Sequence, residues 1–283
     1  MRTSRERDAS DRRGLIAHLS RFVTPSRLEK IEAVLEQRTR YLTVVLEDIY
    51  QPHNASAVLR SCDGFGVQDA YIVENRNTYR INPGVELGTS KWLNLTRFGE
   101  KSYNTLEAVS YLRERGYRIV ATSPREAEEG RGQGAGESEE SPDPEGVAGG
   151  GADESTGERA VEIEGMGSDR AAGTAGTPLE EFDLEKGKTA LFFGNELDGL
   201  TEEMMQGADE HLYIPMYGFV ESFNISVSCA LTLHYLTHEL RQSTLEWALT
   251  EGEKEEIMLE WLRNSITRWE TIEEEWRKTQ NEG

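Results

Sequence analysis

Three polar segments of this 283-residue chain hold the side chains whose types and spacing could do chemistry, and each follows a short apolar run. The first segment, 47–66, reads EDIYQPHNASAVLRSCDGFG and contains Asn54 and Arg60. Asn54 is placed to cap a helix that begins at Ala55. Arginine holds its proton too firmly to be a good base, but its guanidinium is a good fork for a phosphate. An ordinary surface arginine is the alternative interpretation of Arg60.

The second segment, 192–203, reads FFGNELDGLTEE. A glycine at Gly194, directly after an apolar run, predicts a tight turn at which a ligand can approach the backbone. The spacing from Gly194 to Gly199 resembles a phosphate-binding loop, but the Lys-Ser/Thr pair that such a loop requires does not follow Gly199. Glu196 and Asp198 would also repel a triphosphate. The segment therefore argues against an ATP site.

The third segment, 214–236, reads IPMYGFVESFNISVSCALTLHYL. Ser222 and Asn224 precede a helix of small residues, and either could cap it. Taken singly, each serine is better explained as a cap than as a catalyst. The sequence has no G-x-S-x-G elbow, and its five histidines form no metal-ligand pattern. We therefore expect no metal ion.

The elements that must position these segments alternate between strands and helices. This order predicts an α/β domain with a mostly parallel sheet, whose ligands lie beyond the carboxyl ends of the strands. Apolar β-branched runs predict strands at 42–46, 70–73, 93–98, 118–122, 189–193 and 212–214. Helical periodicity predicts helices at 55–62, 103–115 and 225–240.

Helical extensions are predicted at both ends of the chain. Residues 1–40 have apolar side chains at helical spacing, and their other face is either solvated or directed toward RNA; its cations are Arg27, Lys30, Arg38 and Arg40. Residues 246–283 hold four of the five tryptophans between glutamates. Aromatic residues at such spacing indicate packing, either between two copies of the chain or within one copy.

The net charge of −21 argues at first against a nucleic-acid partner, but the charge is unevenly distributed. Residues 126–186 carry 4 basic and 18 acidic groups, whereas residues 1–125 carry 20 basic and 15 acidic groups. From 126 to 178 the chain is rich in Gly, Glu, Ser and Ala and poor in large apolar residues, which predicts a disordered insertion. The alternative is an interaction segment for a basic partner. We expect a domain over 41–245, interrupted at 126–178, between extensions at 1–40 and 246–283.

Two features of composition bear on location. The sequence has no run of about 18 apolar residues, so we expect no membrane span, and the Arg-rich N-terminus does not resemble a secretory signal. Two cysteines make neither a disulfide framework nor a zinc cluster. A reducing compartment, the cytoplasm, is therefore expected.

Four stretches, in this order, resemble the motifs of the SPOUT superfamily of RNA methyltransferases, and most closely its tRNA (guanosine-2′-O-)-methyltransferases. They are LTVVLEDIYQPHNASAVLRSCDGFGV, ELGTSKWLNL, ALFFGNELDGLTEEMMQGAD and IPMYGFVESFNISVSCAL. The resemblance implies a parallel sheet with a C-terminal trefoil knot, an exception to unknotted topology. It also implies a homodimer, S-adenosyl-L-methionine as methyl donor, and guanosine 18 of the tRNA D-loop as the target.

The same resemblance implies roles for individual residues. Arg60 would activate the 2′-hydroxyl, a weak nucleophile, and Lys91 would contact a phosphate of the RNA. The other residues implied at the catalytic centre are Asn54, Glu196, Ser222 and Asn224. Those implied at the cofactor are Thr122, Gly194, Ile214, Met216 and Phe223. The chain departs from the family pattern at Phe223, where leucine is usual, and at Thr89-Ser90, next to the Lys91-Trp92 pair.

Two alternatives stay open. A ribosomal RNA 2′-O-methyltransferase is the nearest one, although such relatives commonly carry a separate folded N-terminal RNA-binding domain, for which 40 residues are too few. A non-catalytic RNA-binding protein of the same fold is the other, and the presence of Asn54, Arg60 and Glu196 argues against it.

Overall fold

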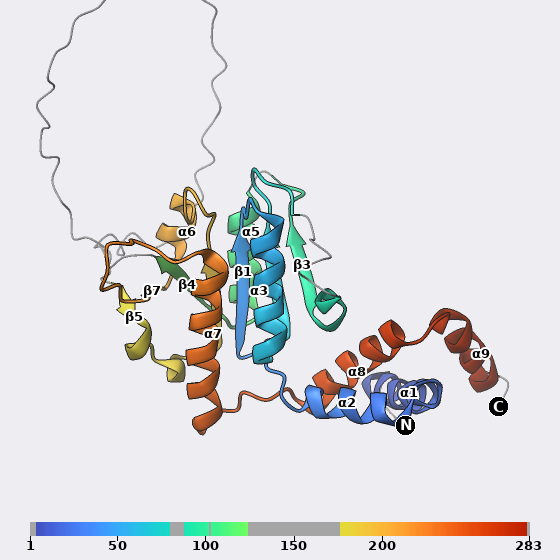
Figure 1. Cartoon of the computed structure of the whole chain (residues 1–283). Coiled ribbons are helices and arrows are strands. Elements are labelled where there is room, and N and C mark those ends of the chain that lie inside the picture. The colour runs from blue at the N-terminus through green and yellow to red at the C-terminus, as the bar shows by residue number, and fades with distance from the viewer. Residues whose placement is uncertain (1–3, 80–87, 102, 124–175, 282–283) are drawn as a thin grey trace, which may run out of the picture.

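A seven-stranded parallel sheet forms the centre of the computed structural model, which describes residues 4–79, 88–101, 103–123 and 176–281. The strand order is β3-β2-β1-β6-β4-β7-β5 (Figure 1), and each neighbouring pair is parallel. The strands are β1 (Leu42–Glu47), β2 (Asp69–Val73), β3 (Asn94–Phe98), β4 (Arg118–Ser123), β5 (Thr177–Pro178), β6 (Thr189–Phe193) and β7 (Glu210–Tyr213). The predicted fold class is thus confirmed as a mostly parallel α/β sheet.

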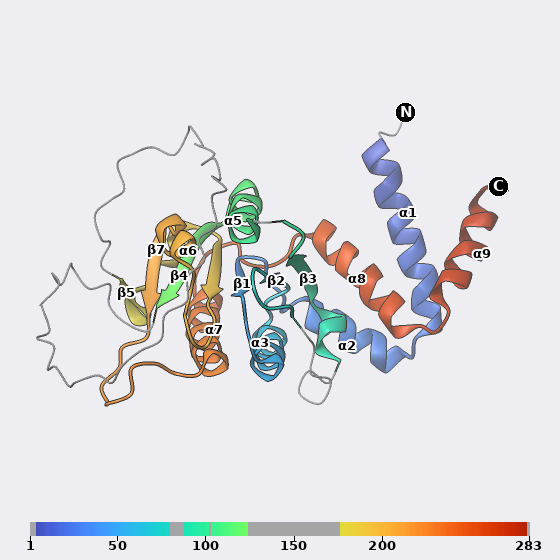
Figure 2. The same cartoon turned by 90° about the horizontal axis from the view of Figure 1, so that it is seen from above.

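Helices cover both faces of the sheet (Figure 2). Helices α3 (Pro52–Phe65) and α7 (Ile225–Gln242) pack on one face, and α5 (Asn104–Glu114) and α6 (Glu202–Gly207) pack on the other. Because β1 is covered on both sides, all six of its residues are buried, and its apolar residues at 44–46 are consecutive rather than alternating with polar ones. Short 3-10 turns lie at Ser20–Phe22, Thr89–Trp92, Leu179–Glu181 and Leu184–Lys186.

Helix α3 begins earlier than the sequence predicted. Pro52 occupies its first turn after the N-cap residue Gln51, where the fixed φ of proline suits a helix start and its missing N–H costs nothing. Asn54 therefore lies inside the helix, and its predicted capping role is wrong. Asn224, by contrast, caps α7 as predicted, because its side chain accepts a hydrogen bond from the backbone N–H of Ser226.

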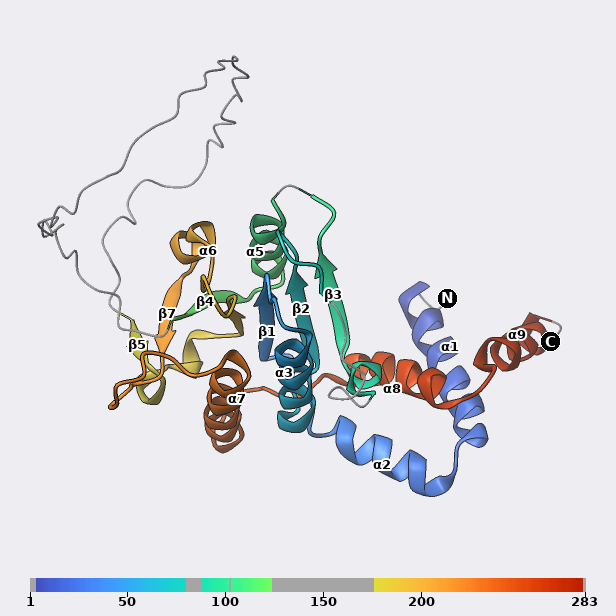
Figure 3. The ribbon, with the colours of Figure 1, turned by 45° about the horizontal axis from the view of Figure 1, so that its top comes forward.

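The two ends of the chain form one helical module, which we define as α1 (Ser4–Leu19), α2 (Pro25–Leu35), α8 (Glu251–Ser265) and α9 (Trp269–Asn281). It lies beside the β3 edge of the sheet, and both termini belong to it (Figure 3). Its core includes Leu19, Ile31, Trp261 and Leu262, all buried. The aromatic stripe of the C-terminal extension therefore packs within the chain, one of the two arrangements that the sequence left open.

Trp92 joins the helical module to the sheet domain. Its ring meets the edge of Trp261 with ring centroids 5.7 Å apart, and the guanidinium of Arg27 lies 4.8 Å from the Trp92 ring. Beside it, Asn264 Nδ2 donates to the backbone carbonyl of Lys91 at 2.7 Å. The segment that carries Lys91 is thus held from both sides.

Two elements were not predicted from the sequence: the short helix α6 and the two-residue strand β5. Most of the predicted insertion lies outside the described residues, but Thr177 and Pro178, at its end, pair with β7. Ser123 on β4 and Pro178 on β5 both stand opposite Tyr213 of β7, one on each side. Adjacent strands lie about 4.8 Å apart, so Ser123 and Pro178 are roughly 10 Å from each other.

Candidate active site

A pocket of about 420 Å³ opens at the carboxyl ends of β4, β6 and β7. This is where an open parallel sheet places its ligands, and the volume lies in the range of small-molecule sites. All five residues that the sequence implied at a cofactor line it: Thr122, Gly194, Ile214, Met216 and Phe223. Glu196 and Ser222, implied at the catalytic centre, line it too.

The segment Gly194–Leu200, which we call the pocket loop, forms one wall. Asn195 and Gly199 exchange backbone hydrogen bonds of 2.9 and 3.0 Å, and Gly199 has a left-handed φ of +76°. A Cβ on Gly194 would lie 2.2 Å from the backbone carbon of Gly199, so only glycine fits there. The prediction of a tight turn at Gly194 is confirmed.

Glu196 joins the pocket loop to the start of α3. Its carboxylate accepts hydrogen bonds from Asn54 Nδ2 at 2.7 Å and from the backbone N–H of Tyr50 at 3.1 Å. Asn224 Nδ2 in turn donates to Asn54 Oδ1 at 3.2 Å. Three residues implied at the catalytic centre, from three separate polar segments, therefore form one hydrogen-bonded cluster.

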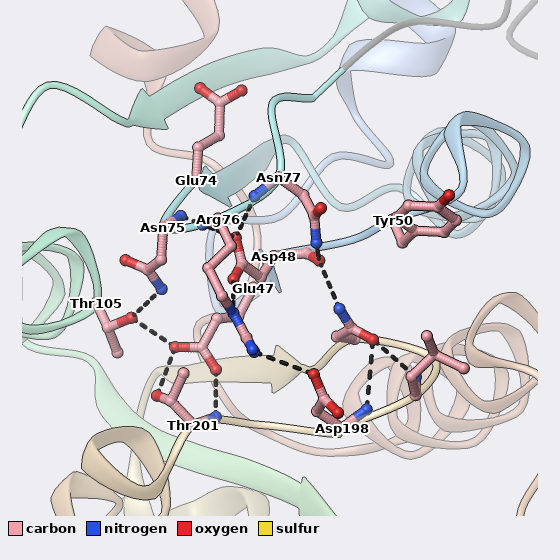
Figure 4. A network of polar contacts seen from close by, with 12 residues as sticks. Glu47, Asp48, Tyr50, Glu74, Asn75, Arg76, Asn77, Thr105, Asp198 and Thr201 are labelled. Atoms are coloured by element: carbon pink, nitrogen blue, oxygen red, sulfur yellow. Dashed lines mark hydrogen bonds and ion pairs between the residues drawn. The ribbon is translucent and has the colours of Figure 1, made fainter. Parts of the chain in front are cut away.

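A second polar network lies behind the pocket loop, at the end of β1 (Figure 4). The buried Glu47 carboxylate accepts from the hydroxyl of Thr105 and from both the backbone N–H and the hydroxyl of Thr201, at 2.8 and 2.9 Å. Asp48 accepts from the segment after β2. Sequence analysis missed both acids, although their position directly after a buried strand is a signal that could have found them.

Arg60 lies away from this cluster. It is exposed, on the part of α3 beyond Asn54, and it is not among the described residues that line the pocket. Arg60 follows Asn54 by six positions along the helix, so the two side chains leave the helix about 120° apart. The structure thus brings Asn54, Glu196 and Asn224 together, but not Arg60 with them.

The five cations assigned to RNA divide into two groups. Arg27, Lys30 and Lys91 are exposed. The RNA assignment of the other two is wrong, because both are engaged inside the protein. Arg38 is only 1% exposed and pairs with Asp63, and burial lowers its pKa in spite of that partner. Arg40 pairs with Asp69 at 3.0 Å and with Glu253 of α8 at 3.2 Å.

The sequence predicted neither a metal site nor a membrane span. Within the described residues, no group of three or more His, Cys, Asp or Glu side chains could hold a metal ion. In that same part of the chain, no helix combines the length and apolar character that crossing a membrane requires.

The fold and the pocket define a class: an α/β protein with a pocket of small-molecule size at the carboxyl edge of a parallel sheet. A model of the SpoU rRNA Methylase family matches residues 41–135 and 160–234. The chain is 33% identical to a tRNA (guanosine(18)-2′-O)-methyltransferase of Borreliella burgdorferi, over 91% of this chain and 94% of that protein. The chain therefore belongs to the SpoU rRNA Methylase family.

Other relatives agree with this placement. A protein of Thermus thermophilus with the same name as that of Borreliella is 28% identical over 85% of this chain and 97% of its own. The crystal structure of the A. aeolicus TrmH/SpoU tRNA modifying enzyme matches the fold with a TM-score of 0.60 at 24% identity, over 86% of this chain and 98% of that one.

Proposed function

We propose that this protein transfers a methyl group from S-adenosyl-L-methionine to the 2′-hydroxyl of a guanosine ribose in tRNA, and that guanosine 18 of the D-loop is the target. One observation carries the proposal: a single pocket is lined by all five implied cofactor residues and adjoins the cluster of Asn54, Glu196 and Asn224. Membership of a methylase family supports the same reaction.

The pocket fits this cofactor in size and charge. Among its described lining residues, the charged side chains are Glu196 and Asp198, both acidic. A negative wall favours a cationic ligand over a nucleotide triphosphate. When bound, S-adenosyl-L-methionine supplies an electrophilic methyl group on a positively charged sulfur. Thr122, Gly194 and Ile214 would hold it from the ends of three strands.

In this reaction the protein must activate the ribose 2′-hydroxyl, which is a weak nucleophile. Arg60 is proposed to polarise the 2′-hydroxyl, with its guanidinium held by a phosphate of the bound RNA. Asn54, Glu196 and Asn224 hold the adjoining loops in place, and Ser222 orients the substrate from the pocket wall.

A homodimer would bring Arg60 to a pocket. Arg60 is exposed and lies outside the pocket of its own chain, on the helix packed beside α7. Large apolar side chains are also exposed on α7 and on the segment before it: Tyr217, Phe219, Val220, Phe223, Val227 and Leu231. A second copy that covers this face could complete each pocket with the Arg60 of its partner.

RNA is proposed to dock along the exposed cations Arg27, Lys30 and Lys91. Trp92 and Asn264 hold the Lys91 segment and the helical module in a fixed relation. The trefoil knot is likewise a proposal, supported by the strand order: β6 lies between β1 and β4, and β7 lies between β4 and β5. We propose the cytoplasm as the location, because the substrate and the methyl donor are found there.

Transfer RNA is favoured over ribosomal RNA by the extent of the matches. The Borreliella relative named for tRNA is matched over 94% of its length. The 23S rRNA (guanosine-2′-O-)-methyltransferase RlmB of Coxiella burnetii is matched over only 68% of its length, at 24% identity. The helical module thus has its counterpart in the tRNA enzyme.

The decisive experiment is transfer of a labelled methyl group from S-adenosyl-L-methionine to an unmodified tRNA transcript, with the modified nucleotide mapped. We expect a 2′-O-methylguanosine at position 18 and none in a ribosomal RNA fragment. Arg60→Ala should lower kcat roughly 100-fold or more while the cofactor Kd stays within twofold. Arg97→Ala, which removes another exposed arginine, is the control. Full turnover by Arg60→Ala would remove Arg60 from the mechanism.

The dimer is tested separately, by mixing two inactive variants. Gly194→Val closes the pocket, because its Cβ meets the Gly199 backbone. If Arg60 serves the pocket of the other subunit, random mixing with Arg60→Ala should restore about a quarter of the wild-type activity, since half of the dimers then hold one intact site. No recovery, or a monomer by light scattering, would contradict the dimeric site.

A further inference from the structure

The pocket loop is tied to the end of β1 by Asn195 and, through Arg76, by Asp198. Asp48 is the residue at which these ties meet. It is buried and has a left-handed φ of +57°, a conformation that few residues other than glycine adopt. Aspartate is one of the few side chains that adopt it with some frequency.

One oxygen of the Asp48 side chain binds the segment after β2. It accepts hydrogen bonds from three consecutive backbone N–H groups, those of Asn75, Arg76 and Asn77, at 2.8, 2.7 and 3.0 Å. Burial acts to raise the pKa of this carboxyl, but these donors and the Arg76 side chain outweigh it, and the pKa is lowered. Asp48 is thus an ionised anchor for that segment.

Asn195 connects the same anchor to the pocket loop. Its Nδ2 donates to the backbone carbonyl of Asp48 at 3.1 Å. Its Oδ1 accepts from the backbone N–H of Leu197 at 2.7 Å and from that of Asp198 at 3.4 Å. One buried amide therefore sets the curvature of the loop and its position against β1.

Arg76 makes a second connection, on the solvent side (Figure 4). Its Nε lies 3.2 Å from Asp48 Oδ2, and another guanidinium nitrogen lies 3.2 Å from Asp198 Oδ2. Asp198 lines the pocket. The side chain of Arg76 is 63% exposed, so it can be removed without opening the core.

We propose that Asn195 and Arg76 are positioning residues for the cofactor: by joining the pocket loop to Asp48, they hold it in the shape that receives S-adenosyl-L-methionine. The inference rests on the proposed function, because it takes that molecule as the ligand of the pocket. Arg76 is not among the described residues that line the pocket, whereas Asn195 is one of them. These two residues raise the fraction of protein molecules in which the pocket already has the shape that binds the cofactor.

The first test is the cofactor Kd of Arg76→Ala in the full chain, measured by isothermal titration calorimetry. We expect binding to weaken roughly threefold to tenfold, because an exposed ion pair and a second pair with a buried carboxylate are lost together. The KM for the cofactor should rise by the same factor, with kcat and the KM for tRNA within twofold of wild type. The cofactor Kd of Arg76→Lys should lie between those of wild type and Arg76→Ala, since an ammonium lacks the fork that spans both carboxylates.

The matched control is Arg97→Ala. Arg97 is 49% exposed and pairs with Glu74, which belongs to the same segment after β2, and none of its described contacts reaches the pocket loop. Its cofactor Kd should equal that of wild type. Asn195→Ala should weaken binding roughly tenfold or more, because it leaves buried partners unsatisfied. That variant endangers the fold, so Arg76 carries the test.

A double-variant experiment tests whether Arg76 affects cofactor binding through Asp198. In an Asp198→Asn background, the effect of Arg76→Ala should fall below twofold, because its partner on the loop has already lost its charge. An equal effect in both backgrounds would overturn the inference. So would an unchanged cofactor Kd in Arg76→Ala, or a rise confined to the KM for tRNA, which would make Arg76 an RNA contact. Wild type that fails to bind the cofactor would instead overturn the proposed function itself.

Discussion

The pocket end of the sheet and the helical module are both built from segments far apart in sequence, yet different forces hold them. At the pocket end, the carboxylates Glu47, Asp48 and Glu196 accept hydrogen bonds from neighbouring loops. In the module, Leu, Ile and Trp side chains pack around Trp261. Hydrogen bonds are directional and fix loop geometry, whereas apolar packing is not directional and supplies stability. A binding site needs the fixed geometry that hydrogen bonds provide, whereas the helical module needs the stability that apolar packing provides.

The largest effect in a test of this contrast is expected from Trp261→Ala. Removal of a fully buried tryptophan costs about 3–5 kcal/mol, so the helical module should unfold at lower denaturant than the sheet domain. Tryptophan fluorescence and far-UV circular dichroism should then report separate transitions. The cofactor Kd should stay within twofold of wild type, whereas the KM for tRNA should rise. A cofactor Kd that rises when the helical module unfolds would contradict the proposal that the pocket end of the sheet is independent of the module.

Asp48→Asn tests the pocket end and its dependence on pH. Loss of the carboxylate should cost about 1–3 kcal/mol at neutral pH. The pKa of Asp48 is lowered in the folded protein, so its stabilising contribution is complete above the ordinary carboxyl pKa of about 4. That contribution is lost as the pH falls through the folded-state value. The gap in unfolding free energy between wild type and variant should therefore narrow below about pH 4, and a gap that widens there would contradict the assignment.

Glu273→Gln applies the same change of charge to the module. The nearly buried Glu273 carboxylate pairs with Arg263 at 2.8 Å and with Arg277 at 2.7 Å, joining α8 to α9. Because both arginines are partly exposed, we expect a loss of only about 1 kcal/mol in chemical denaturation. The cofactor Kd, measured on the same sample, should not move. Glu273→Gln should therefore change stability and leave cofactor binding as it is.

The smallest effect is expected from replacing residues 127–174 with a short Gly-Ser linker. On either side of this segment, Ser123 of β4 and Pro178 of β5 flank Tyr213 of β7 and lie about 10 Å apart, a distance that a few residues span. Melting temperature, cofactor Kd and tRNA methylation should all match those of wild type. A dead but folded enzyme would show that the acidic segment belongs to the function.

Sequence patterns located the elements well where a residue type has one dominant preference. Apolar runs located β1 and β6, the glycine at Gly194 located the turn, and Asn224, one of the two caps that the sequence offered for α7, is the residue that caps it. The prediction that Asn54 caps α3 was wrong because Pro52 starts the helix one turn earlier. Arg38 and Arg40 were misplaced because helical periodicity does not show which cations pair with an acid inside the protein.

The sequence by itself determined the alternation of strands and helices and the unequal distribution of charge, because these depend on local preferences and composition. The residues of the pocket were expected from the resemblance to a known family, and local patterns alone did not indicate them. Only the tertiary structure decided which distant polar groups meet: Glu196 with Asn54, Asn195 with Asp48, and Arg76 with Asp198. Such pairs depend on the strand order and on loop paths, which no local pattern encodes. It also decided that Arg60 lies outside the pocket of its own chain, since that depends on the rotation of α3 against the sheet.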